Sequence, residues 1–280
     1  MSERIIRVMQ VMFITALAVL GSSVSLGWAQ TANPAPADHP EITVHGRKFT
    51  PGSILARNMG TPEDQTAQFP PHKIIGNLYY VGTRTLSSFL IVTPQGNILI
   101  NSTYERNVPT IEKSVEQLGF KFSDIKILLG THAHNDHQEG DALLKQLTGA
   151  QTMAMAEDVP ALRAITPGGT EHPIDKTLHD GETVTLGGTT LTAHLTPGHT
   201  RGCTTWTMKA REGAKTYNVV IVGSPNVNAG YKLVNNALYP QIASDYERMF
   251  RVLKSLPCDI FLGAHGNYYG MEAKDRKSVV

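Results

Sequence analysis

Three histidines and one aspartate lie within six consecutive residues of the sequence, at His132, His134, Asp136 and His137. His132 and His134 are two residues apart, so in extended backbone both side chains point to the same side and can bind one ion. Asp136 and His137 follow at once, and a turn there would let them bind a second ion beside the first. Imidazole and carboxylate ligands without thiolate suit zinc best. The spacing therefore predicts a site for two Zn²⁺ ions.

The secondary structure before this motif must hold the four side chains in position. Residues 125–129 are apolar except for Lys126 and lead directly to the histidines, which predicts a buried strand with the motif on the loop that follows. Upstream, apolar β-rich runs at 78–81, 89–92 and 98–100 predict strands, and the last two are joined by a tight turn. Residues 109–118 show helical spacing before Gly119 ends the pattern.

Strands and helices continue to alternate after the motif. The expected strands are at 152–154, 183–186, 191–195, 204–208, 219–222 and 260–262, and the expected helices are at 142–147, 159–164 and 244–256. Ser244 is a candidate N-cap of the last helix. Strand pairs with helices in each half predict an α/β (α+β) fold in which two sheets pack together with helices outside. Because no linker interrupts this region, residues 41–280 are predicted to form a single catalytic domain.

Composition excludes several classes of protein. The chain has 280 residues, of which 41% are hydrophobic, so it can bury a substantial core. Its 25 Lys and Arg nearly balance 24 Asp and Glu, which leaves no basic field for a nucleic-acid partner. Eleven histidines against two cysteines favour imidazole and carboxylate chemistry over thiolate clusters.

The first residues have a different character from the rest. Arg4 and Arg7 precede an apolar run over 8–20, and small residues lead to Gly27-Trp28-Ala29. This pattern predicts a signal peptide over 1–29, a mobile leader over 30–40, and export to the periplasm. The alternative is an uncleaved membrane anchor, but the run is short for a bilayer span. No stable membrane association is expected after cleavage.

The stretch Thr131 to His137 resembles the HxHxDH signature of the metallo-β-lactamase superfamily. The loops Thr196-Pro197-Gly198-His199-Thr200 and Gly263-Ala264-His265-Gly266 resemble its second and last ligand loops. The similarity covers roughly His72 to Gly270. It implies an αββα sandwich of two mixed β-sheets flanked by helices, with the metal site along the sheet edges. It assigns His132, His134 and His199 to the first ion, and Asp136, His137 and His265 to the second.

The superfamily includes β-lactamases, lactonases, nucleases and thioesterases, and the position after the 219–222 strand separates them. Relatives with a bridging carboxylate carry an aspartate there, whereas this chain has Ser224. A serine together with the Asp-His-His set resembles subclass B3. The resemblance implies a class B enzyme that hydrolyses the β-lactam amide bond of penicillins, cephalosporins and carbapenems with a metal-bound hydroxide, and it implies a monomer.

The same resemblance implies roles for residues beyond the ligands. Ser224 and Asn226 would contact the substrate carboxylate, Tyr231 would approach the oxyanion, and Asp136 would orient the hydroxide as a catalytic residue. His194 is expected to be structural. Asn101 stands where relatives commonly carry an aspartate, which could loosen metal binding. Cys203 and Cys258 are expected as free thiols, because the partner cysteines of relatives are missing.

Two other functions compete with this interpretation. One is a thioesterase or lactonase of the glyoxalase II type on the same scaffold; Ser224 and the exported context argue against it. The other is a non-catalytic metal-binding protein of the cell envelope. All six ligands are intact, which argues against loss of the reaction.

Overall fold

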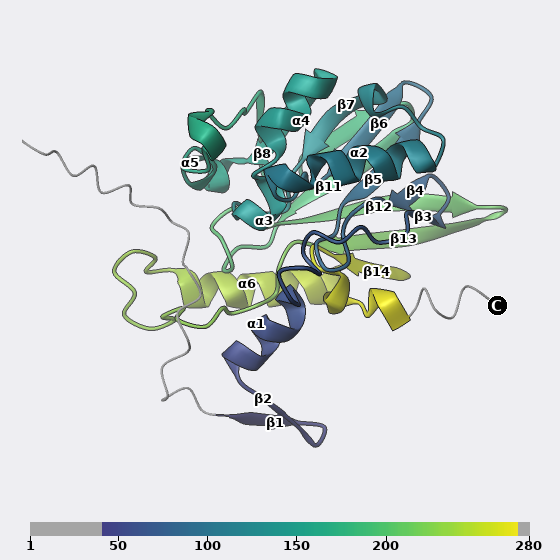
Figure 1. Cartoon of the computed structure of the whole chain (residues 1–280). Coiled ribbons are helices and arrows are strands. Elements are labelled where there is room, and N and C mark those ends of the chain that lie inside the picture. The colour runs from purple at the N-terminus through teal and green to yellow at the C-terminus, as the bar shows by residue number, and fades with distance from the viewer. Residues whose placement is uncertain (1–40, 274–280) are drawn as a thin grey trace, which may run out of the picture.

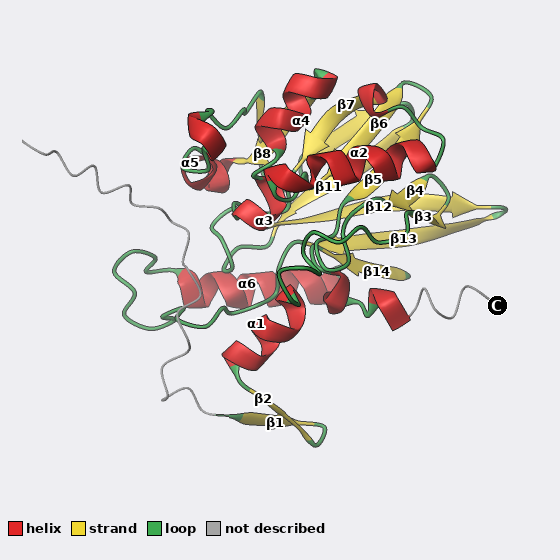
Figure 2. Cartoon of the chain, viewed as in Figure 1, coloured by secondary structure: helices red, strands yellow, loops and turns green. Residues whose placement is uncertain are grey.

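In the computed structural model, which describes residues 41–273, two β-sheets pack face to face and helices lie on their outer faces (Figure 1). Helices α2 and α4 lie on one side of the sandwich, and α6 lies on the other side (Figure 2). This arrangement confirms the predicted αββα sandwich. The predicted signal peptide and leader lie outside the described residues.

The larger sheet has seven strands, antiparallel from β3 to β6 and parallel from β6 to β9. In spatial order it consists of β3 (His72–Ile75), β4 (Leu78–Tyr80), β5 (Phe89–Thr93), β6 (Gly96–Ile100), β7 (Ile125–Leu129), β8 (Gln151–Met155) and β9 (Lys176–Leu178). The predicted tight turn joins β5 to β6, where the Thr93 hydroxyl donates to the Gly96 carbonyl at 2.6 Å. Gly96 has a φ of 116°, which only glycine adopts readily.

The smaller sheet has five strands, all antiparallel except for the last pair, β13 and β14. In spatial order it consists of β10 (Thr183–Leu186), β11 (Thr189–Leu195), β12 (Thr204–Glu212), β13 (Lys215–Val222) and β14 (Ile260–Gly263). A separate hairpin is formed by β1 (Ile42–Val44) and β2 (Arg47–Phe49).

The core follows from the apolar faces of these strands. Between the sheets, Leu78, Ile100 and Leu129 from the larger sheet share one buried cluster with Trp206 and Ile221 from the smaller sheet. A second cluster lies on the outer face of the larger sheet, under the helices α2 and α4. The helices are α1 (Pro51–Met59), α2 (Val108–Gln117), α3 (Asn135–Gln138), α4 (Asp141–Thr148), α5 (Val159–Leu162) and α6 (Ile242–Ser255).

The predicted start of the last helix is wrong. Helix α6 begins at Ile242 with Gln241 as its N-cap residue, rather than with Ser244. Ser244 lies inside the first turn of the helix, where its hydroxyl donates to the Gln241 carbonyl at 2.8 Å. Among the helices of residues 41–273, none combines the length and the apolar character needed to cross a bilayer.

Candidate metal centre

The histidine motif follows the C-terminal end of β7, which is an interior strand of the larger sheet. The Gly130 carbonyl accepts from Trp206 Nε1 at 3.0 Å, which ties this strand end to the smaller sheet. A Cβ on Gly130 would lie 2.0 Å from the terminal amide of Gln138, so this side chain packs directly against the glycine. The predicted loop contains one short helix, α3, which carries Asp136 and His137.

His132, His134 and His199 form the first cluster. Their ligand atoms all lie within 4.8 Å of one another. His199 Nδ1 lies 2.9 Å from the Asn226 carbonyl, and because a carbonyl only accepts, this nitrogen carries the proton. The other ring nitrogen, Nε2, is then left with a free lone pair. The same holds for His132, whose buried Nε2 has no hydrogen-bond partner among the described residues.

A chain of hydrogen bonds fixes His132. The backbone N–H and the hydroxyl of Thr131 both donate to Asn101 Oδ1, each at 3.0 Å. The Thr131 oxygen is therefore free to accept the Nδ1 proton of His132 at 3.2 Å. Asn101 has a φ of 66°, a region that asparagine tolerates better than most residues. At this position, where the family resemblance led us to expect an aspartate, an amide oxygen supplies the acceptor.

Asp136, His137 and His265 form the second cluster. Asp136 Oδ2 lies 3.2 Å from His137 Nε2 and 3.6 Å from His265 Nε2. The two Nε2 atoms lie 3.1 Å apart. At this distance they can share at most one proton, whereas a cation would bind the lone pairs of both. The structure thus brings the six predicted ligand residues together in the two predicted groups, and their donor atoms fit zinc-type metal binding.

The protonation states of both clusters suit a metal. Burial lowers the pKa of His132 and His199 well below the ordinary value, and lowers that of His265 to about 3. Burial alone would raise the pKa of Asp136, but the attraction of His137 and its hydrogen bond hold that pKa below the usual range. At neutral pH these imidazoles are neutral and the carboxylate is ionised, which is the state that binds a metal ion.

This electrostatic arrangement predicts acid lability of the metal-free protein. A histidine in the unfolded chain takes up a proton below about pH 6.5, whereas buried His265 stays neutral down to about pH 3. Unfolding therefore takes up protons in this window, and stability should fall by at most about 1.4 kcal/mol per pH unit for each such histidine as pH is lowered. Urea midpoints at pH 7 and pH 5 measure this. The stability of a His265→Asn variant should fall less steeply with decreasing pH than that of the parent protein. Equal slopes for the two proteins would contradict the prediction.

Asp158 is a site residue that the sequence did not reveal. Its carboxylate is buried and accepts hydrogen bonds from Ala133, Thr200 and Gly202, which belong to the two histidine loops. Burial raises its pKa to about 6, although these hydrogen bonds act in the opposite direction. The only signal for it was its position just after β8, a strand parallel to β7 whose end lies at the same edge of the sheet.

The three predicted substrate contacts lie close to the metal centre. Ser224 is fully buried, and its hydroxyl lies 3.0 Å from that of Tyr268, which also accepts from Asn226 Nδ2 at 3.0 Å. The Tyr231 hydroxyl donates to the His199 carbonyl at 2.9 Å. Tyr268, which connects two of the predicted contacts, was missed because its position in the sequence shows no motif.

A cavity of about 470 Å³ opens onto the first cluster. His134, His199 and Tyr231 are among its polar lining residues, and Ser224 and Asn226 do not line it. Its apolar wall includes Pro160, Ala161, Leu238, Tyr239 and Ile242. The cavity therefore joins a largely apolar surface to the candidate metal ligands, as expected of a site for a small organic molecule.

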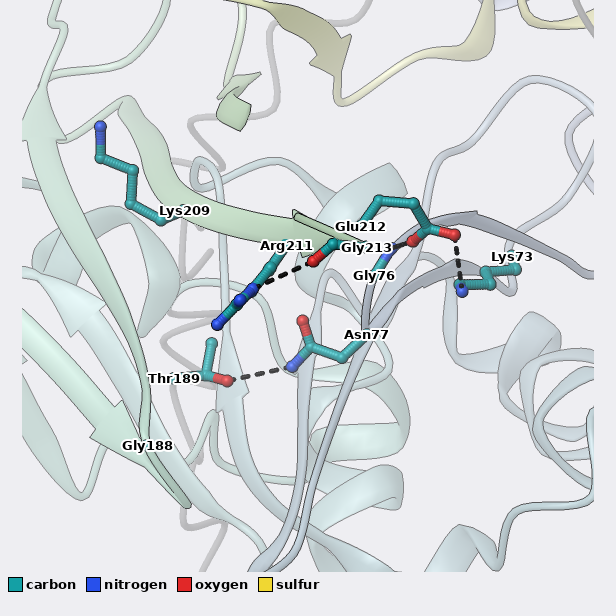
Figure 3. Close-up of a pocket in the computed structure, with 9 residues that line it drawn as sticks. All are labelled: Lys73, Gly76, Asn77, Gly188, Thr189, Lys209, Arg211, Glu212 and Gly213. Carbon is teal, nitrogen blue, oxygen red and sulfur yellow. Dashed lines mark hydrogen bonds and ion pairs between the residues drawn. The ribbon is translucent and has the colours of Figure 1, made fainter. Parts of the chain in front are cut away.

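A second groove, of about 530 Å³, lies between the β3–β4 turn and the β12–β13 hairpin (Figure 3). Its charged side chains already have polar partners: Lys73 pairs with Glu212 at 3.2 Å, and Arg211 donates to the Gly213 carbonyl at 3.1 Å. It is lined by none of the predicted ligands, so this groove is not the candidate site.

Two further predictions concern residues outside the clusters. His194 Nε2 lies 2.8 Å from the Thr207 hydroxyl on the neighbouring strand, in keeping with a structural role. Cys203 is buried and Cys258 is exposed, and no disulfide joins them.

Comparison with known proteins places these features in a family context. The model of the metallo-beta-lactamase superfamily matches residues 81–265. The native FEZ-1 metallo-beta-lactamase from Legionella gormanii is 54% identical over 76% of this chain and 86% of its own, with a TM-score of 0.74. BJP-1, a subclass B3 metallo-beta-lactamase of Bradyrhizobium japonicum, is 39% identical over 76% of this chain and 84% of its own, with a TM-score of 0.71.

Two other similarities bear on metal content and on activity. The class B3 di-zinc metallo-beta-lactamase LRA-12 from an Alaskan soil metagenome is 34% identical over 77% of this chain and 85% of its own, with a TM-score of 0.72. The hydroxyacylglutathione hydrolase of Hyphomonas neptunium is 34% identical over 87 residues, which are 31% of this chain and 29% of that protein. The match thus spans less than a third of this curated relative.

Proposed function

Because the chain belongs to the metallo-β-lactamase superfamily, we propose that it is a subclass B3 metallo-β-lactamase that hydrolyses the amide bond of β-lactams. The observation that carries the proposal is the identity of 54% to a metallo-beta-lactamase over 76% of the chain. The two intact candidate metal clusters support it. The proposed substrates are penicillins, cephalosporins and carbapenems.

We propose further that two zinc ions occupy the clusters, one held by His132, His134 and His199 and one by Asp136, His137 and His265. The orphaned Nε2 of His132 and the close pair of Nε2 atoms in the second cluster support this assignment. When bound, zinc would supply Lewis-acid chemistry and would lower the pKa of a coordinated water to about 7. The di-zinc relative supports the count of two.

The chain's own residues would bind the substrate and move the proton. Asp136 is ionised at neutral pH, so its carboxylate can accept a hydrogen bond from the attacking water and can help to deliver a proton to the amide nitrogen. The apolar wall of the 470 Å³ cavity would bind the substrate and exclude bulk water.

Contacts to the substrate's charged groups are part of the same proposal. Tyr231 lines the cavity, and its hydroxyl donates a hydrogen bond to the His199 carbonyl. During the reaction this hydroxyl would donate to the developing oxyanion instead. Ser224 and Asn226 do not line the cavity and both hydrogen-bond to Tyr268, so their proposed contact with the substrate carboxylate would run through water.

Removal of zinc tests this function. Hydrolysis of nitrocefin and of a carbapenem by the purified protein is expected to fall by about 10²-fold or more in dipicolinic acid, because the metal supplies several kcal/mol of transition-state stabilisation. Added zinc should restore it. Circular dichroism before and after chelation controls for unfolding. Turnover that persists in metal-free protein would overturn the proposal.

A second candidate function is a thioesterase or lactonase on the same scaffold. The partial similarity to hydroxyacylglutathione hydrolases favours it. Ser224 argues against it, because thioesterases of this type carry a bridging aspartate at that position. A glutathione thioester and a lactone, assayed beside nitrocefin, separate the two. Turnover of only the thioester or lactone would reassign the function.

We propose that the protein works in the periplasm as a monomer, after cleavage behind Ala29, without nucleic-acid or stable membrane partners. The basic and apolar pattern of residues 1–29 supports export. Sequencing the N-terminus of the exported protein tests it. A mature chain that begins at Met1 would contradict cleavage.

A further inference from the structure

One buried carboxylate connects the two loops that carry the histidines of the first cluster. Asp158 lies in the 3₁₀ helix η3 (Ala156–Asp158), directly after β8, and is 2% exposed. Its Oδ2 accepts from the backbone N–H of Ala133 at 2.8 Å and from the hydroxyl of Thr200 at 2.7 Å. Its Oδ1 accepts from the backbone N–H of Gly202 at 2.6 Å. These distances are typical of strong, charge-assisted hydrogen bonds.

The donors to Asp158 are placed where the cluster is built. Ala133 lies between the ligands His132 and His134, and Thr200 directly follows the ligand His199. The carboxylate therefore holds one loop from the larger sheet against one loop from the smaller sheet. None of these three bonds involves a residue of the second cluster, which consists of Asp136, His137 and His265.

The backbone at Gly202 is shaped for this contact. A Cβ at this position would lie 2.5 Å from the backbone nitrogen of Asp158 and 2.7 Å from its Cβ. Because a backbone atom cannot swing away as a flexible side chain can, only glycine lets the second histidine loop approach Asp158 so closely. The requirement for glycine indicates that the contact between loop and carboxylate is tight.

We propose that Asp158 is a positioning residue that fixes the separation of the two histidine loops and so sets the zinc affinity of the first cluster, but not of the second. The proposal rests on the proposed function only in taking the first cluster as a zinc site. Residues that orient metal ligands typically change metal affinity by about 10- to 100-fold when they are replaced. A carboxylate that only stabilised the fold would affect both clusters alike.

Asp158→Asn is the most informative variant. It keeps the size of the side chain but replaces one acceptor oxygen by an NH₂ group, which must face a donor at one of the three contacts. Zinc affinity is measured by competition with a chromophoric chelator in two backgrounds. His265→Ala leaves the first cluster complete, and His199→Ala leaves the second complete.

The expected result is a loss of about 10- to 100-fold in zinc affinity in the His265→Ala background, and a change below about 3-fold in the His199→Ala background. Equal loss in both backgrounds, or no loss in the first, would overturn the proposal. This experiment does not measure the hydrolysis of β-lactams. A protein that bound zinc but did not hydrolyse β-lactams would still give these affinities, so failure of the proposed function can be distinguished from failure of this proposal.

A control variant at Asp259 and two variants of Thr200 complete the test. Asp259 also accepts two hydrogen bonds, from the backbone and side-chain nitrogens of Asn218 at 2.7 Å each, but it lies at the far end of β14 from His265. Asp259→Asn should leave both affinities unchanged. Thr200→Ser keeps the hydroxyl donor and should retain first-cluster affinity, whereas Thr200→Val should lose part of it. This pair decides the question if Asp158→Asn does not fold.

Discussion

Replacement of Asp136 by alanine is expected to lower kcat/KM for nitrocefin by about 10³-fold or more, or about 4 kcal/mol in the activation free energy. Asp136 is the only carboxylate among the candidate ligands, and its Oδ2 lies within 3.6 Å of both histidines of the second cluster. Its loss would remove a ligand and the group proposed to move the proton. Steady-state kinetics with the zinc-loaded variant measure the effect.

The exposed neighbour Asn135 provides the control for this variant. Asn135 lies in the same short helix, but its side chain donates to Glu139 at 2.9 Å and belongs to neither cluster. Asn135→Ala should keep activity within a few-fold of the parent, and both variants should unfold cooperatively. An Asp136→Ala protein that retained a tenth of the parent activity would exclude Asp136 from the proposed role.

Local spacing was enough to predict four of the six candidate metal ligands. His132, His134, Asp136 and His137 lie together in the sequence, so the geometry of a single loop could be inferred from it. His199 and His265 were assigned only by resemblance to a family. His265 lies 128 residues from His137, and no periodicity of one chain segment predicts that their Nε2 atoms meet at 3.1 Å.

The supports of the ligands were harder to predict than the ligands. Asp158 reaches Ala133 across 25 residues and Gly202 across 44 residues, so its role depends on how the two sheets pack. Tyr268 likewise acquires its role through Ser224 and Asn226, which approach it only in the folded chain. Asn101 was noticed because it departs from the residue common in relatives, but its hydrogen bonds to Thr131 required the structure.

The strands were predicted well wherever apolar residues run without interruption. β6 and β7 are almost entirely buried, and both were expected within a few residues of their ends. β1, β2, β3 and β9 were missed because each is only three or four residues long and has at most one buried residue, so they carry little apolar pattern. Ser244 was a reasonable N-cap by residue type, but the helix begins two residues earlier.

Replacement of Trp206 by alanine is expected to lower the free energy of unfolding by about 3–5 kcal/mol, because it leaves a large cavity between the sheets. Trp206 is 1% exposed and belongs to the cluster that both sheets share. It also donates from Nε1 to the Gly130 carbonyl at the end of β7, two residues before His132. Urea denaturation of the metal-free protein measures the loss.

Trp206→Phe separates packing from the hydrogen bond. Phenylalanine keeps much of the ring but leaves the partly buried Gly130 carbonyl without its indole donor, which should cost at most about 1–3 kcal/mol. If the two variants lost equal stability, the hydrogen bond to the strand end would dominate, and the cavity argument would be wrong. A larger loss in Trp206→Ala means that the packing of the two sheets stabilises the strand end from which the histidine motif begins.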